Sequence, residues 1–275
     1  MLKKALIPLL FVATSSQAEL VGQWDFENNT QDSSGNHILS EDRGDTPLSY
    51  IDRNGEKAAY FADNSYIALD YSYDTYQSAM SFSLWFNTSH SAAITDWSTE
   101  TGNWSILDFD RSDYFNFALD SEGHAWLGIA FVTERIDYDT SPRIVYDHKS
   151  EETFNDGNWH QVVTTYGKHN GLQVRIDGDV VISDAYRGEF GRTDSVRYGI
   201  IGDGSEAETY DGERNARYYE GAIDNVKLYD DELAMQHIDN LFFYDTVEDV
   251  PAPLFGGLSL LPLPFLRKRQ NLKSF

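Results

Sequence analysis

Asn155-Asp156-Gly157-Asn158-Trp159-His160 opens the stretch that decides the fold. Two segments follow it, 161–166 and 172–176, and both are rich in β-branched and aromatic side chains with apolar residues at alternate positions. A period of two predicts strands that turn one face to a core and the other to water. Asp177-Gly178 comes next and predicts a two-residue hairpin turn, because such turns need residues that tolerate positive φ. The middle of the chain is therefore predicted to be an antiparallel meander.

Further motifs occur in order along the rest of the chain, at Trp24-Asp25-Phe26, 58–69, 80–86 and 219–229. Together with the N-D-G-x-W-H and I-D-G motifs, they resemble the laminin-G-like, concanavalin-A-type jelly-roll family over residues 20–243. The resemblance implies an all-β fold, a two-sheet antiparallel jelly-roll sandwich with one short C-terminal helix. That family is a binding scaffold, so the fold alone does not define a function.

Residues 19–243 are predicted to form one domain, because no linker-like run interrupts them. Strands are predicted near 21–26, 58–62, 65–70, 80–87, 104–110, 114–119, 124–131, 159–166, 171–177, 179–184, 197–202 and 218–229. Asp230-Asp231 predicts the start of a helix over 232–241, with Ala234, Ile238 and Leu241 on one face. Three polar segments, 88–103, 132–153 and 203–217, are predicted to be long insertions, where binding specificity is often found.

The N-terminal residues have the features of an export signal. Lys3 and Lys4 precede an apolar run over 5–13, and small residues follow at 16–18. This order predicts a signal peptide over residues 1–18; a short buried helix is the alternative. The sequence contains no cysteine, which excludes disulfides and thiolate metal sites.

Residues 244–275 are predicted to lie outside the domain. Pro251-Ala252-Pro253, an apolar run over 254–266 and a basic cluster at 267–269 resemble the PEP-CTERM sorting tail of Gram-negative bacteria. The resemblance implies an exosortase-like processing enzyme as a partner and delivery to the cell surface or extracellular matrix. The apolar run is short for a membrane helix, so only transient membrane contact is expected. The alternative is an apolar tail without a sorting role.

The chain is strongly acidic, with a formal net charge of −24. Such a surface repels the phosphates of nucleic acids, so we expect no nucleic acid partner. The acidic residues either keep an exported protein soluble or gather divalent cations.

Asp224 is the best candidate for a metal ligand. The spacing of Ile223 and Val226 around it breaks strand alternation and predicts a bulge, where a carboxylate needs a partner. The family resemblance implies a structural Ca²⁺ here, held by Asp224 with Asp63 or Asn64 and main-chain carbonyls. Hydrogen bonds from Asp224 to loop N–H groups are the alternative.

Other candidate metal ligands are weaker. Asp108 and Asp110 share a strand face, but they lack the EF-hand pattern. The histidines lack zinc-binding spacing, and His160 is predicted to be a strand residue with a hydrogen-bond partner.

The motifs of catalytic relatives are not found. The E-x-D-x-x-E string of laminarinase-type enzymes is missing, as are the Q-I/V-H strand of alginate lyases and a G-x-S-x-G elbow. We therefore expect no enzymatic activity.

Aromatic residues in or beside the insertions are the predicted ligand-binding residues, because exposed rings stack on the C–H faces of sugars. They are Trp97, Trp104, Tyr138, Tyr146 and Tyr210. The alternative is that these rings pack the insertions onto the sandwich. Trp24, Trp85 and Trp159 lie in strand motifs and are predicted to be core or sheet-facing.

These features together predict a non-catalytic, secreted protein of a Gram-negative bacterium, calcium-stabilised and surface-sorted, with a polysaccharide or matrix glycan as its partner. Two alternatives stay open. One is a structural exopolysaccharide-matrix protein without a specific ligand, and the other is an unrecognised polysaccharide lyase or hydrolase.

Overall fold

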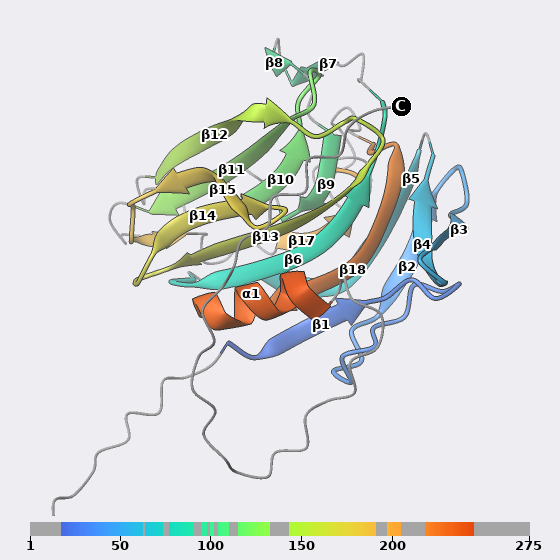
Figure 1. Cartoon of the computed structure of the whole chain (residues 1–275), viewed down its shortest axis with the longest axis horizontal. Helices are drawn as coiled ribbons and strands as arrows, with labels where there is room; N and C mark the ends of the chain where they lie inside the picture. The colour runs from blue at the N-terminus through green and yellow to red at the C-terminus, as the bar shows by residue number, and fades with distance from the viewer. Residues whose placement is uncertain are drawn as a thin grey trace, which may run out of the picture.

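The computed structural model describes residues 18–62, 64–73, 77–90, 95–97, 100–101, 104–109, 115–132, 143–190, 197–204 and 218–244. Within these residues, two antiparallel sheets of eight strands each face one another and form a sandwich (Figure 1). The predicted all-β jelly-roll class is therefore confirmed.

The first sheet has the strand order β15 (Asp179–Asp184), β14 (Gly171–Ile176), β13 (Trp159–Gly167), β6 (Met80–Asn87), β18 (Gly221–Tyr229), β4 (Glu56–Phe61) and β3 (Ser49–Arg53), and β1 (Leu20–Trp24) also pairs with β18. The second sheet has the order β12 (Arg143–Thr153), β11 (His124–Val132), β10 (Phe115–Leu119), β9 (Trp104–Asp108), β17 (Arg197–Ile201), β5 (Ser65–Tyr73) and β2 (Ser40–Gly44), and β16 (Glu189–Phe190) pairs with β11. A separate hairpin joins β7 (Thr95–Trp97) to β8 (Glu100–Thr101).

Each predicted strand is present, but the prediction missed several others. The expected insertion over 132–153 is wrong from residue 143 onward, because Arg143–Thr153 forms the edge strand β12. Its sequence, R-I-V-Y-D-H-K-S-E-E-T, mixes charges with apolar residues, as suits an edge strand with one side in water. The strands β2 and β3 were missed for the same reason, since both are short and mostly polar.

The predicted turn at Asp177-Gly178 is confirmed. Asp177 has φ 53° and Gly178 has φ 87°, and Ile176 pairs with Asp179 directly across the turn. Positive φ at both central residues matches the twist of the flanking strands. The turn therefore fixes the register of β14 and β15.

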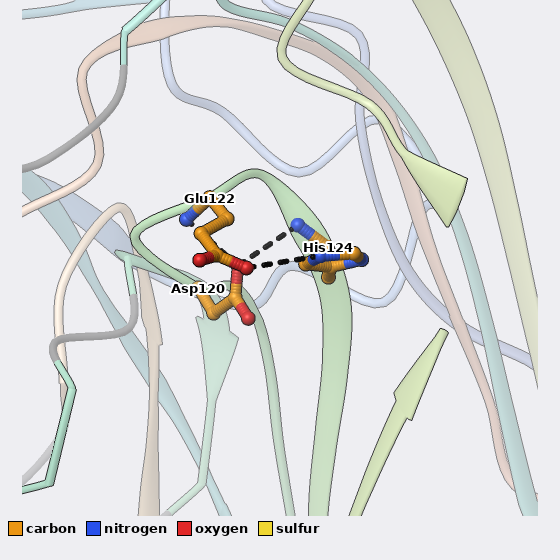
Figure 2. Close-up of side chains that lie close together, drawn as sticks. All are labelled: Asp120, Glu122 and His124. Carbon is orange, nitrogen blue, oxygen red and sulfur yellow. Dashed lines mark hydrogen bonds and ion pairs between the residues drawn. The ribbon is translucent and has the colours of Figure 1, made fainter. Parts of the chain in front are cut away.

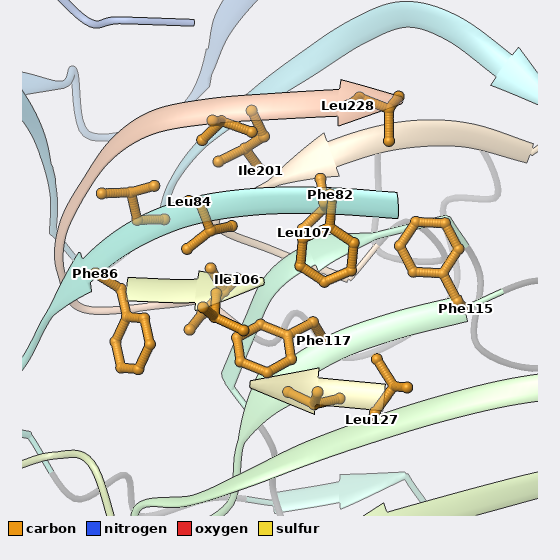
Figure 3. Close-up of a cluster of buried hydrophobic side chains, with 14 of the residues drawn as sticks. Phe82, Leu84, Phe86, Ile106, Leu107, Phe115, Phe117, Leu127, Ile201 and Leu228 are labelled. Atoms are coloured by element: carbon orange, nitrogen blue, oxygen red, sulfur yellow. The ribbon is translucent and has the colours of Figure 1, made fainter. Parts of the chain in front are cut away.

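The core lies between the inner faces of the two sheets (Figure 3). Phe82 of β6 stacks on Phe115 of β10 with ring centroids 5.8 Å apart, and Phe86 meets Phe117 edge-on at 6.3 Å. Phe82, Leu84 and Phe86 of β6 point into the core, and the residues that alternate with them point to the outer face of the first sheet. This contact between distant segments holds the two layers together.

The helix α1 (Met235–Tyr244) lies on the outer side of the first sheet, beside β1 and β18 (Figure 1). It begins three residues after the predicted start at Glu232. Ile238 and Leu241 are buried as predicted, whereas Ala234 is exposed and Leu233 takes its place. Glu232 lies before the helix, and its carboxylate accepts hydrogen bonds from the backbone N–H groups of His169 and Asn170, in the turn after β13. In the described part of the chain, no helix has the length and apolar character that a membrane crossing requires.

Candidate functional site on the outer face of the second sheet

Strand pairing aligns residues into a row across the outer face of the second sheet, the side that points away from the core. From β12 to β5 the row reads Asp147, Gly128, Asn116, Asp108, Ile200 and Ala68. The row therefore has two polar side chains at its centre, with Gly128, Ile200 and Ala68 beside them and the exposed carboxylate of Asp147 at the β12 end.

The two central side chains are almost fully buried, although they point away from the core. Asp108 is 4% exposed and Asn116 is 2% exposed. Nδ2 of Asn116 donates to Oγ of Ser105 at 2.9 Å, and Oδ1 of Asn116 accepts no hydrogen bond within the described residues. A polar atom held out of water is a strong hydrogen-bonding group for anything that reaches it. We call Ser105, Asp108 and Asn116 the central polar strip.

Aromatic side chains flank the central polar strip on both sides. Trp126 of β11 pairs with Ala118, next to the strip, and is largely buried. On the β5 side, Tyr66 stacks on Tyr218 with ring centroids 6.3 Å apart. Between these rings lie the small side chains of Ala118 and Ala68, which are also buried.

Of the five predicted ligand-binding aromatics, Tyr146 alone has a side chain in the described part of the structure. Tyr146 lies on β12 and points to the core side, where its ring packs against Phe131 at 5.4 Å and stacks on His148 at 6.0 Å. Trp97 lies in β7 and Trp104 in β9, and their side chains are outside the described part, as are Tyr138 and Tyr210. Sequence reasoning missed the central polar strip, apart from Asp108, because its members become neighbours only through strand register.

The bulge predicted at Asp224 is confirmed, and the side chain of Asp224 is buried there. The pairing of β18 with β6 shifts register after Asp224, and Asn225 has φ 50°. Oδ2 of Asp224 accepts a hydrogen bond from Nη1 of Arg53 at 2.7 Å, and Oδ1 accepts one from the backbone N–H of Asn225 at 2.8 Å. Burial raises the pKa of Asp224 to about 6, although the Arg53 guanidinium acts in the opposite direction.

The donor set around Asp224 does not fit a calcium ion. Ca²⁺ needs six to eight oxygen ligands, whereas both oxygens of Asp224 receive N–H groups. Ile223 pairs with Ala59 and Gly221 with Phe61, so Asn64 lies beyond the opposite end of this strand pair and is not brought to Asp224. Asn64 instead donates to Asp45 at 2.7 Å. Asp63 lies outside the described residues.

A second group of possible metal ligands, not singled out by the sequence, lies in the turn between β10 and β11 (Figure 2). Oδ1 of Asp120 accepts from the backbone N–H groups of Glu122 and His124, both at 2.9 Å, and Oδ2 forms an ion pair with Lys149. Burial by itself would raise the pKa of Asp120, but Lys149 and the two backbone donors hold it below its usual value. Both oxygens of Asp120 are therefore occupied, by two backbone N–H groups and the lysine ammonium, and the carboxylate anchors the turn.

His160 links the motif at 155–160 to the turn at Asp177-Gly178, and its prediction as a hydrogen-bonded strand residue is confirmed. Its Nδ1 lies 2.8 Å from Oδ2 of Asp177, and its Nε2 lies 3.1 Å from Oδ1 of Asp156. The ring is also packed between Phe86 and Phe154. Burial tends to lower the pKa of His160, but the two carboxylates raise it overall. The network fixes the start of β13 to the β14–β15 turn.

Solved structures share the fold at low sequence identity. Domain 4 of AbnA, a GH43 extracellular arabinanase from Geobacillus stearothermophilus, was solved with arabinotriose; it has a TM-score of 0.58 and 17% identity, and the match covers 82% of this chain and 99% of that one. The binding domain of Paraclostridial Mosquitocidal Protein 1 has a TM-score of 0.55 and 15% identity, with coverage of 81% and 51%. The botulinum neurotoxin serotype D binding domain has a TM-score of 0.54 and 11% identity, with coverage of 84% and 53%.

The matched region thus spans about half of each toxin binding domain. No curated protein sequence matches the chain. A family model, Laminin_G_3, described as the concanavalin A-like lectin/glucanases superfamily, matches residues 61–239, which is more than half of the chain. The sandwich, its strand order and this match together show that the chain belongs to the Laminin_G_3 family of concanavalin A-like lectins and glucanases.

Proposed function

We propose that the protein is a non-catalytic carbohydrate-binding protein and that the outer face of its second sheet holds the glycan. One observation carries the proposal: the three polar side chains of the central polar strip are buried together on a face that points away from the core. Ser105, Asp108 and Asn116 supply the donors and acceptors that sugar hydroxyl groups need.

The flanking rings supply the other half of sugar recognition. In the proposal, the C–H groups of a sugar ring pack at the edges of Trp126 and of the Tyr66–Tyr218 pair, whose rings are mostly buried on this face. The similarity to an arabinanase domain solved with arabinotriose supports a glycan as the ligand class and suggests arabino-oligosaccharides as the first probes. The similarity to two toxin binding domains supports binding as the general role.

Export and surface retention belong to the same proposal. In it, residues 1–18 direct export, and residues 244–275 are processed by an exosortase-like enzyme at the surface of a Gram-negative bacterium. Nearly all of both segments lies outside the described residues. Cell fractionation of the full chain and of a chain lacking 244–275 tests retention: loss of surface retention in the shortened chain supports it, and unchanged retention contradicts it.

Binding is tested with the purified protein on a glycan array, in calcium and in chelator, followed by calorimetry with arabinotriose or the best array ligand. Asp108→Asn removes the central carboxylate and should weaken binding about tenfold, as expected for the loss of a charge-assisted hydrogen bond. Asp52→Asn is the matched control, because Asp52 is an exposed carboxylate on the first sheet.

The outcomes separate the alternatives. Equal loss of affinity in both variants would place the site elsewhere. A protein that binds no glycan under either condition would favour the structural matrix role. Release of sugars or unsaturated products from alginate, laminarin or agar would establish an enzyme and overturn the non-catalytic part of the proposal.

A further inference from the structure

The bulge at Asp224 places a carboxylate where water cannot reach it. Asp224 is 1% exposed, in the middle of β18, and β18 lies between β6 and β4 in the first sheet. An ionised carboxylate in such a place is strongly unfavourable unless a positive charge lies beside it. The ionised form of Asp224 therefore needs a cation at this point.

Arg53 supplies that cation from the edge of the sheet. It is the last residue of β3, and its side chain must cross β4 to reach β18. Ala58 lies on β4 next to the inward-facing Ala59, so its small side chain shares the outer face and leaves room for this crossing. The arginine is itself 6% exposed and ends with Nη1 2.7 Å from the carboxylate.

Two indole rings fix the guanidinium in place. The Cζ atom of Arg53 lies 4.2 Å from the ring centroid of Trp85 and 5.1 Å from that of Trp159. Both distances are within the range of cation–π attraction, and a planar guanidinium suits such stacking better than an ammonium group. The rings belong to β6 and β13, so the cluster of Arg53, Trp85, Trp159 and Asp224 ties an edge strand to the centre of the sheet.

We propose that the Arg53 guanidinium is the resident cation of the β18 bulge, and that the sandwich is closed there without a divalent metal ion. A metal ion at Asp224 would stand within a few ångströms of a fixed positive charge, which opposes its binding. It would also have to displace the two N–H donors that already bond both carboxylate oxygens. This inference concerns stability and stands or falls separately from the proposed glycan binding.

Thermal unfolding of the full chain, in EDTA and in millimolar CaCl₂, tests the proposal. The wild-type Tm should be the same in both buffers. Arg53→Met keeps most of the side-chain volume but leaves Asp224 unpaired, so its Tm in EDTA should fall by about 10 °C. Arg43→Met is the matched control, because Arg43 forms an ion pair on the surface, and its Tm should change little.

The double variant Arg53→Met with Asp224→Asn keeps the proposal testable if the single variant does not fold. It should be more stable than Arg53→Met, because it buries no unpaired charge. A wild-type Tm that rises in CaCl₂, with the rise abolished by Asp224→Asn, would overturn the proposal. A rise that Asp224→Asn retains would locate the ion elsewhere and support it. A double variant that is no more stable than Arg53→Met would contradict the role of Arg53 as counter-ion.

Discussion

The side chain of Asp177 joins His160 at 2.8 Å while its own backbone forms the turn between β14 and β15. One residue therefore does two things: it adopts positive φ in a hairpin, and it supplies a charge to the neighbouring strand. The other oxygen of the same carboxylate accepts the backbone N–H of Gln161 at 2.9 Å. The two motifs that stand apart in the sequence are thus parts of one local structure.

The first prediction concerns pH. The pKa of His160 is raised in the folded state, so its charge contributes stability that is fully present below the unfolded pKa, near 6.5, and is lost as pH rises through the folded pKa. Urea unfolding at several pH values between 5 and 9 should show the free energy of unfolding falling with rising pH more steeply in wild type than in His160→Gln.

The comparison with His160→Gln is needed because other groups with shifted pKa values also make the free energy of unfolding depend on pH. The pKa of His237 is lowered by burial and by Lys227, which gives stability that is lost as pH falls, and the raised pKa of Asp224 acts in the direction of His160. These contributions are common to both proteins and cancel in the difference. Parallel pH profiles for the two proteins would show that Asp156 and Asp177 do not raise the pKa of His160 in the folded state.

The second prediction separates the two tasks of Asp177. Asp177→Asn keeps tolerance of positive φ and one acceptor oxygen, whereas Asp177→Ala loses both, so the alanine variant should lose about 1–3 kcal/mol more. Urea unfolding at pH 6 measures both. Equal destabilisation would show that the charge alone matters.

The third prediction concerns the core contact between the sheets. Phe82→Ala removes a ring that packs against both Phe115 and Phe117 and should cost about 3–5 kcal/mol. Val180→Ala, at an exposed position on the edge strand β15, should change stability by about 0.5 kcal/mol or less. Chemical unfolding of the two variants gives the comparison, and similar values for both would contradict the packing described for Phe82.

The fourth prediction concerns the flanking aromatic of the proposed glycan face. Trp126→Ala should weaken glycan binding about tenfold, because it removes one ring face beside the central polar strip. Met235→Ala, on exposed α1 at the other sheet, should leave binding unchanged. Calorimetry with the best array ligand measures both, and circular dichroism confirms that each variant is folded. Undiminished affinity in Trp126→Ala would exclude this ring from the site.

Alternation was enough to predict the central strands, because β6, β13 and β14 each turn one face to the core. It was not enough for β3, whose five residues include only two apolar ones. A signal was nevertheless present: Asn54-Gly55 has φ 51° and 98° and forms a two-residue turn between β3 and β4. That dipeptide is the usual marker of such hairpins.

The partner of Asp224 was beyond prediction from local patterns. Arg53 is separated from it by 171 positions, and the two meet only because β4 lies between β3 and β18 and carries a small residue at the crossing. The central polar strip depends likewise on the pairing of β9 with β10. Aromatic content suggested the insertions as the binding region, whereas the described ring of Tyr146 packs toward the core.

The position of α1 has a consequence for orientation. Ala18 and Leu20 pack with this helix, and the backbone N–H of Glu19 donates to Asp230 at 2.7 Å, so the first and last described segments leave the domain from the same side. That side is the exterior of the first sheet (Figure 1). A copy tethered to any support through either segment would therefore display the second sheet toward the surroundings.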